Sequence, residues 1–197
     1  MNELSEINRT LILAKIDCFY TELLEKYEEE KYNEQEYERL CAAFKSPKDI
    51  LGRDIEDALA WKYGKTHENL LKNPKYKGVI SSFVDGWPTF LEDGASTGDA
   101  VFNYWSKRIG SSFISVAFVA HLIFPSEIPI VDQHTFRAIR YFLGQVRFNH
   151  GVRKVPASLE DIHTLKEFVK TFATSKNVSL REFDKYLMMF GKHVAPR

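Results

Sequence analysis

The sequence predicts an all-α protein. Apolar residues recur at intervals of three and four along most of the chain, which is the period of an amphipathic helix. Helix start signals are frequent, and no two alternating segments are joined by hairpin-turn chemistry. A chain of 197 residues suits one domain, or two small lobes that share a cleft.

Each helix is predicted from its own pattern. The first apolar stripe, over residues 3–30, contains Ile12 and Ile16, and a second helix follows over residues 34–44. Ser46-Pro47 combines an N-cap with a proline at the first helical position and opens a helix that ends at Gly64. Further helices are predicted over residues 76–90, 97–107, 111–124, 133–143, 159–174 and 180–193. Ser179-x-x-Glu182 is a predicted capping box, and Ser158-x-x-Asp161 is a near match to the same pattern.

The predicted helices form one unit that spans residues 1–197. Within it, residues 1–95 supply mainly N-terminal helices. Residues 96–145 supply a hairpin and a helix that begins with an aspartate, and residues 146–197 supply a basic loop and the C-terminal helices.

Composition excludes several classes of protein. Cys18 and Cys41 are too few for a disulfide framework or a four-cysteine metal site, so we expect two small buried side chains in a reducing compartment. The first ten residues hold no apolar signal core, and no apolar stretch approaches a membrane span. The histidines and glycines form no metal or nucleotide motif. We therefore expect a cytoplasmic protein with no membrane association, no metal and no cofactor.

Asp132 is the most informative residue of the chain. It closes the apolar run Ile128-Pro129-Ile130-Val131 and opens an amphipathic helix. Aspartate is among the best N-cap residues, and spacing alone favours that role. The same carboxylate in a semi-buried cleft could instead stabilise positive charge or activate water.

The residues upstream of Asp132 alter this balance. A turn of Gly110, Ser111 and Ser112 precedes a strongly apolar helix that runs to about residue 124, and a proline break leads to Val131-Asp132-x-His134-x-x-Arg137. This order resembles the helix-hairpin-helix DNA glycosylase superfamily. The pattern of that family reads L-P-G-x-G-x-K-T-A, then an apolar helix, then V-D-x-H-x-x-R.

Gly110 takes the first hairpin glycine of that pattern, Ser112 the second, and Ser115 the threonine. Ile114 takes the place of the lysine, eighteen residues before Asp132, which is the spacing of the endonuclease III type. The hairpin proline, the second glycine and the cysteines of an iron–sulfur cluster are missing. The resemblance is therefore to a divergent relative.

The resemblance implies a helix-hairpin-helix glycosylase-like fold, with two helical lobes around a cleft. It implies hydrolysis of the N-glycosidic bond of a modified or mismatched base that is flipped out of duplex DNA. Asp132 would be the catalytic residue, His134 and Ser115 would support it, and the hairpin residues Gly110, Ser111 and Ser112 would contact DNA. Because Ile114 replaces the lysine that forms a Schiff base, strand cleavage is not expected unless another lysine, such as Lys107, reaches the sugar.

The charge of the chain is unevenly distributed. The first 60 residues hold 15 acidic and 8 basic side chains, although the whole chain is neutral. No acidic residue lies between Gln133 and Leu159, where the basic residues are Arg137, Arg140, Arg147, Arg153 and Lys154. Of these, Arg137, Arg147, Arg153 and Lys154 are candidate phosphate contacts. A solvated basic loop is the alternative.

Two interpretations of function remain open. In the first, the protein is a glycosylase without lyase activity. In the second, it is a catalytically silent module that binds nucleic acid or a protein through the same fold. The oligomeric state is left open. His121, Trp61 and Trp105 could be a ligand or base-stacking residues, but core packing is the better interpretation of each.

Overall fold

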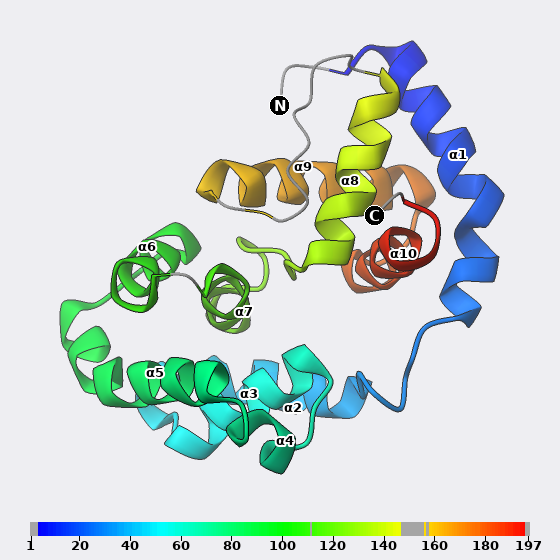
Figure 1. Cartoon of the computed structure of the whole chain (residues 1–197). Coiled ribbons are helices and arrows are strands. Elements are labelled where there is room, and N and C mark those ends of the chain that lie inside the picture. Colours follow the sequence, from blue (N-terminus) through cyan, green and yellow to red (C-terminus); the bar gives the residue numbers. More distant parts are fainter. Residues whose placement is uncertain (1–3, 111, 147–155, 157, 196–197) are drawn as a thin grey trace. The chain divides into compact units, whose positions relative to one another are not determined.

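The computed structural model describes residues 4–110, 112–146, 156 and 158–195 (Figure 1). Every regular element in this described part is a helix, and no strand occurs in it. The all-α prediction is therefore confirmed. No helix of the described part is long and apolar enough to cross a membrane. The chain divides into two compact units: unit 1 combines Met1–Tyr27 with Val131–Arg197, and unit 2 is Glu28–Ile130.

The described residues of unit 1 form four helices, which Figure 1 labels α1 (Glu6–Glu25), α8 (Gln133–Val146), α9 (Leu159–Lys176) and α10 (Leu180–His193). Helix α10 is the centre of the unit, because it packs against each of the other three helices. Its apolar residues meet rings from its neighbours; the ring centroids of Phe142 and Phe190 lie 4.5 Å apart. Burial of these aromatic rings, together with the aliphatic side chains around them, favours folding of this unit.

Unit 2 contains the remaining elements: α2 (Glu34–Phe44), η1 (Pro47–Asp49), α3 (Gly52–Tyr63), α4 (His67–Leu71), α5 (Pro74–Asp93), α6 (Gly98–Ile109) and α7 (Phe113–Ile123). Residues 115–122 of α7 are all buried, which explains why that segment is apolar on every side. Helix α7 packs against α2, α3 and α6. A second aromatic cluster surrounds Trp105, whose ring centroid lies 4.7 Å from that of Phe83.

Several helix ends differ from the prediction. The first helix stops at Glu25, because the next two backbone N–H groups bond carbonyls three residues back and tighten the last turn. Ser46-Pro47 opens only the 3₁₀ turn η1, and the chain is extended at Ile50 before α3 begins. Gly64, at a φ of 56°, ends α3 as predicted. Helix α4 was not predicted, since five residues are too few to show a helical period.

Both serine caps form, but only one is a full capping box. The Ser158 hydroxyl accepts a hydrogen bond from the backbone of Asp161, whose carboxylate accepts one from Ser158 N. Ser179 accepts from Glu182 N at 3.0 Å, whereas the Glu182 carboxylate accepts from the Tyr20 hydroxyl at 2.8 Å. The second box is therefore half formed, because its acidic member links α10 to α1.

The expectation of two buried thiols is wrong. Cys18 is exposed and Cys41 is half-buried. Cys18 lies two residues from Ile16, which places it on the opposite side of α1 from the buried stripe. The expectation of core packing for His121, Trp61 and Trp105 is confirmed, since all three are buried. His121 Nδ1 lies 2.7 Å from Ile128 O, and its Nε2 lies 2.8 Å from the Tyr37 hydroxyl.

Candidate functional site

Two helices joined by a short turn stand where the sequence predicts a hairpin. Helix α6 ends at Ile109, and Gly110 follows with a φ of 63°, a conformation that favours glycine. The N–H of Gly110 donates to Ser106 O at 3.1 Å and so completes the end of α6. The rings of Phe102 and Phe113 lie 5.1 Å apart and hold α6 against α7.

The N-cap residue of α7 does not cap the helix through its side chain. Ser112 occupies the N-cap position, but its hydroxyl accepts no capping hydrogen bond, and the residue is buried. Helix α7 begins directly after it at Phe113. The Ser112 hydroxyl therefore does not accept a hydrogen bond from the backbone N–H groups of the first turn. Because a helix N-terminus is an anion-binding element, this end of α7 suits a phosphate. Ser111, the remaining hairpin residue, lies outside the described residues.

Ser115 makes a contact inside unit 2. Its hydroxyl lies 2.7 Å from the hydroxyl of Tyr63, which comes from α3. Burial raises the pKa of Tyr63 above its ordinary value, and the hydrogen bond with Ser115 opposes that rise. Ser115 therefore ties α7 to α3, while its neighbour Ile114 is half-buried.

Asp132 is the N-cap of α8 in unit 1. Its Oδ1 accepts hydrogen bonds from His134 N at 2.5 Å and from Thr135 N at 2.8 Å. In return, the Thr135 hydroxyl accepts from Asp132 N at 3.1 Å. Thr135 is fully buried. This reciprocal arrangement fixes both the backbone and the carboxylate of Asp132 on the first turn of α8.

His134 and Arg137 share that turn with Asp132. A guanidinium nitrogen of Arg137 lies 2.5 Å from His134 Nδ1, so this ring nitrogen accepts the bond and the ring is neutral. Burial, with a smaller contribution from the positive charge of Arg137, lowers the pKa of His134 below its ordinary value, and the charge of Asp132 opposes this. The three residues of the predicted V-D-x-H-x-x-R pattern therefore do come together.

Helix α10 closes against this turn at Gly191. A Cβ atom built on Gly191 would lie 1.8 Å from the carbonyl oxygen of His134, so only glycine fits there. The backbone of Gly191 also takes part in a hydrogen bond with His134. The first turn of α8 is thereby held by its own cap on one side and by the backbone of α10 on the other.

The remaining predicted site residues fall into two groups. Arg147, Arg153 and Lys154 lie outside the described residues. Arg137, the described member of the predicted phosphate contacts, is half-buried on α8, as is its neighbour in the acid-free window, Arg140. Within the described part of the chain, no three His, Cys, Asp or Glu side chains are placed to hold a metal ion.

Three notable residues of these regions were missed by the sequence analysis. Thr135 could have been found, because Asp-x-x-Thr has the spacing of a reciprocal cap. Gly191 stands within the apolar pattern of the last helix, where a glycine signals close approach of another backbone. Lys62 is buried in unit 2, with its Nζ 5.5 Å from the centroid of the Phe118 ring. Because lysine is charged, the local sequence gave no indication that the Lys62 side chain is buried.

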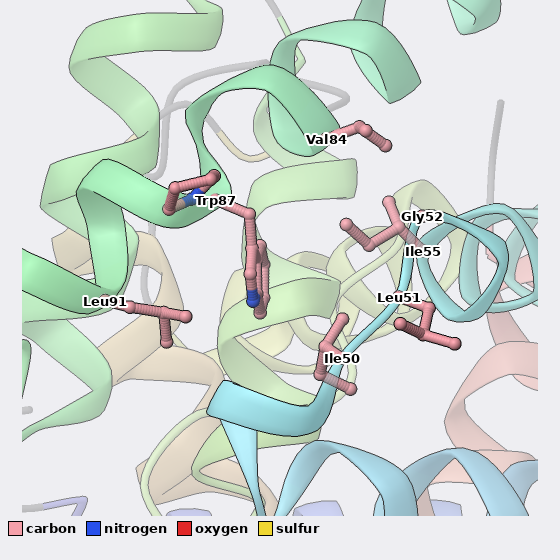
Figure 2. Close-up of a pocket in the computed structure, with 8 residues that line it drawn as sticks. Ile50, Leu51, Gly52, Ile55, Val84, Trp87 and Leu91 are labelled. Carbon is pink, nitrogen blue, oxygen red and sulfur yellow. The ribbon is translucent and has the colours of Figure 1, made fainter.

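Unit 2 also carries an apolar pocket of about 230 Å³, shown in Figure 2. It lies between α5 and the segment that leads into α3, and its walls include Ile50, Leu51, Ile55, Val84, Trp87 and Leu91. No residue that the sequence predicts for the site lines it, and no lining side chain is titratable. The pocket therefore suits an apolar group and offers no acid–base chemistry.

No known protein family, curated protein sequence or solved structure matches this chain.

Proposed function

We propose that this protein is a DNA glycosylase with a helix-hairpin-helix glycosylase-like fold. It hydrolyses the N-glycosidic bond of a modified or mismatched base and leaves the strand intact. The observation that carries the proposal is the first turn of α8, where a fixed carboxylate (Asp132) stands beside a neutral histidine (His134) held by Arg137. The α6–α7 hairpin upstream, with its glycine turn, supports the same function.

Hydrolysis of the N-glycosidic bond requires a negative charge and a water molecule near the sugar. Cleavage of a glycosidic bond passes through an oxocarbenium-like sugar, which a carboxylate stabilises. The same carboxylate can accept a proton from the attacking water. Backbone hydrogen bonds to Asp132 Oδ1 fix the carboxylate before the substrate arrives, so little reorganisation is needed during the reaction.

DNA contacts are assigned to two places. The N-terminus of α7, where the Ser112 side chain makes no capping hydrogen bond, would receive a phosphate oxygen, as helix N-termini commonly do. The acid-free window from Gln133 to Leu159, with its five basic residues, would contact further phosphates. Phosphate contacts do not read the base sequence, so the choice of target base would depend on the residues that contact the flipped base.

The direct test is a panel of duplexes that each carry one modified or mismatched base. Each duplex is incubated with the protein, and abasic sites are then measured by strand breakage in hot alkali. The proposal expects abasic sites in at least one duplex and none in the matched undamaged duplex. Failure on every substrate, by a protein that still binds DNA, would favour the silent module instead.

That silent module is a second candidate, and one observation favours it. The carboxylate of Asp132 makes a complete helix cap, which gives the residue a structural role even without chemistry. A protein of this kind would bind duplex DNA, or a protein partner, with no abasic product.

We predict that an active substrate will yield no covalent adduct with the protein. Ile114 cannot form a Schiff base, because its side chain has no nitrogen. Treatment of the reaction with sodium borohydride should therefore trap nothing, and the abasic strand should break only after alkali or heat.

Recovery of a trapped adduct on an active substrate would contradict this prediction. Mapping the modified residue would then identify the lysine responsible. Lys107, which is exposed just before the hairpin, is the first to examine, and the buried Lys62 is the second.

We also predict that the basic window dominates the salt dependence of DNA binding. Changing Arg147, Arg153 and Lys154 to glutamate should weaken binding to every duplex alike. The slope of log K against log salt should fall by roughly one for each phosphate contact that is lost. Binding isotherms at several salt concentrations measure both effects.

The matched control changes three exposed lysines of unit 2, Lys65, Lys75 and Lys77, to glutamate. This control alters the net charge by the same amount. If the control flattens the salt slope as much as the test variant does, overall charge rather than the basic window controls binding.

A further inference from the structure

The contact between His134 and Arg137 depends on the protonation state of the imidazole ring. An arginine side chain can only donate hydrogen bonds, so the guanidinium nitrogen that lies 2.5 Å from His134 Nδ1 is the donor. A neutral imidazole ring offers one acceptor nitrogen, whereas a protonated ring carries N–H groups on both nitrogens and offers none. Protonation of His134 therefore replaces this hydrogen bond by a repulsion between two cations.

The position of Arg137 depends on this contact. Its guanidinium belongs to a half-buried side chain on α8, and its Nε is buried with no hydrogen-bond partner in the part of the chain that the structure describes. Among the described residues, His134 Nδ1 is the acceptor that the structure gives to the guanidinium. Since arginine keeps its charge at every physiological pH, the state of His134 decides whether the two side chains attract or repel each other.

The surroundings of the ring keep His134 neutral at neutral pH. Burial is the main cause that lowers the pKa of His134 below its ordinary value of 6.5. The negative charge of Asp132 opposes this effect, as does a hydrogen bond with the backbone of Gly191 on α10. The positive charges of Arg137 on α8 and Lys192 on α10 lower the pKa further. The ring therefore takes up a proton only when the pH falls below 6.5.

The backbone of His134 connects the ring to the rest of the site. Its N–H donates to Asp132 Oδ1 at 2.5 Å, so the residue takes part in the cap of α8. Its carbonyl group lies against Gly191, where α10 approaches most closely. A movement of the His134 ring consequently acts on the cap of α8 and on the contact of its first turn with α10.

We propose that His134 is a pH-sensitive positioning residue. Its neutral ring holds Arg137 against the first turn of α8, and protonation of the ring releases Arg137 and weakens the contact of that turn with α10. This role goes beyond the glycosylase function and does not depend on it, because the ring titrates whether or not the protein acts on DNA.

Nuclear magnetic resonance tests the proposal directly in the folded wild-type chain. The ring signals of His134, identified as those missing from the His134→Asn variant, should titrate with a pKa below 6.5. The guanidinium N–H signals of Arg137 should be protected from exchange with water above that pKa and should lose their protection at the same midpoint. A His134 pKa at or above 6.5, or Arg137 signals that do not change at the midpoint, overturns the proposal.

Two arginine variants separate the contact from the overall charge of the helix. Arg137→Met removes the hydrogen bond and the adjacent positive charge, so the pKa of His134 should rise. Arg140→Met removes the same charge from a half-buried position one turn further along α8, and it should leave the pKa of His134 unchanged. An equal shift in both variants would show that general charge controls the ring, and would overturn the proposal.

Acid is expected to destabilise unit 1 through the same residue. The pKa of His134 is lower in the folded protein than in the unfolded chain, so the unfolded state binds the proton more readily. The stabilising contribution is complete above pH 6.5, and it is lost as the pH falls through the lower pKa of the folded protein.

His134→Asn measures this contribution. Asparagine places an acceptor oxygen near the position of Nδ1 but does not titrate, so it can hold Arg137 at any pH. Between about pH 8 and about pH 5, the wild type should lose more free energy of unfolding than this variant does. Urea unfolding at both pH values measures the two losses, and equal losses in the two proteins contradict the proposal.

Discussion

Gly191→Ala is expected to lower the free energy of unfolding of unit 1 by about 3 kcal/mol, at the upper end of the range for overpacking. The added methyl group would lie 1.8 Å from the carbonyl oxygen of His134 and 2.5 Å from its carbonyl carbon. These are backbone atoms, so they cannot turn aside as the end of a flexible side chain would. Relief requires α10 to move away from the first turn of α8. Urea unfolding followed by circular dichroism measures the loss.

A second glycine of the same unit provides the control. Gly144 lies on α8, and a Cβ atom built on it would meet nothing within 4 Å. Gly144→Ala should raise the free energy of unfolding by about 0.5–1 kcal/mol, because alanine favours the helix. Opposite signs at the two positions would support the close approach of α10 and α8. A gain of stability in both variants would contradict it.

Where a helix has a regular apolar pattern and a clear N-cap residue, the sequence predicted both of its ends. The bounds of α2 and α10 agree with the prediction, because Asn33 and Ser179 cap their first turns by side-chain hydrogen bonds. The start of α3 was not predictable, since Pro47 can begin a 3₁₀ turn as readily as an α-helix. There the chain breaks at Ile50 before the helix begins. Local sequence signals, such as caps and apolar spacing, predict the ends of a helix well only where they agree with one another.

Site residues that are close together in the sequence were predictable, whereas contacts that depend on the packing of distant helices were not. Asp132, His134 and Arg137 lie within six residues of one helix, so their order in the sequence already places them together. The contact of Gly191 with His134 joins segments far apart in the chain, so a glycine in the last helix can signal a close approach but cannot name the residue that it approaches. The same holds for Ser115, whose bond to Tyr63 depends on how α7 packs against α3.

Asp132→Asn is expected to slow base excision strongly while leaving unit 1 folded. Asparagine caps a helix about as well as aspartate, and its carbonyl oxygen can accept the same bonds from His134 N and Thr135 N. Only the negative charge is lost, and with it the stabilisation of the positive sugar. Loss of one such electrostatic group typically lowers the rate on the order of a hundredfold to a thousandfold. Single-turnover excision on an active duplex measures this effect.

Two further variants separate charge from capping. Asp161→Asn makes the same change at the start of α9, where Asp161 also accepts a backbone hydrogen bond, and it should retain full excision. Asp132→Ala removes the charge and the cap together, so it should lose both activity and about 1 kcal/mol of stability. Full activity of Asp132→Asn would show that the carboxylate does no chemistry. If Asp132→Asn instead unfolded as readily as Asp132→Ala, the charge of Asp132 would serve mainly to hold the first turn of α8 in place.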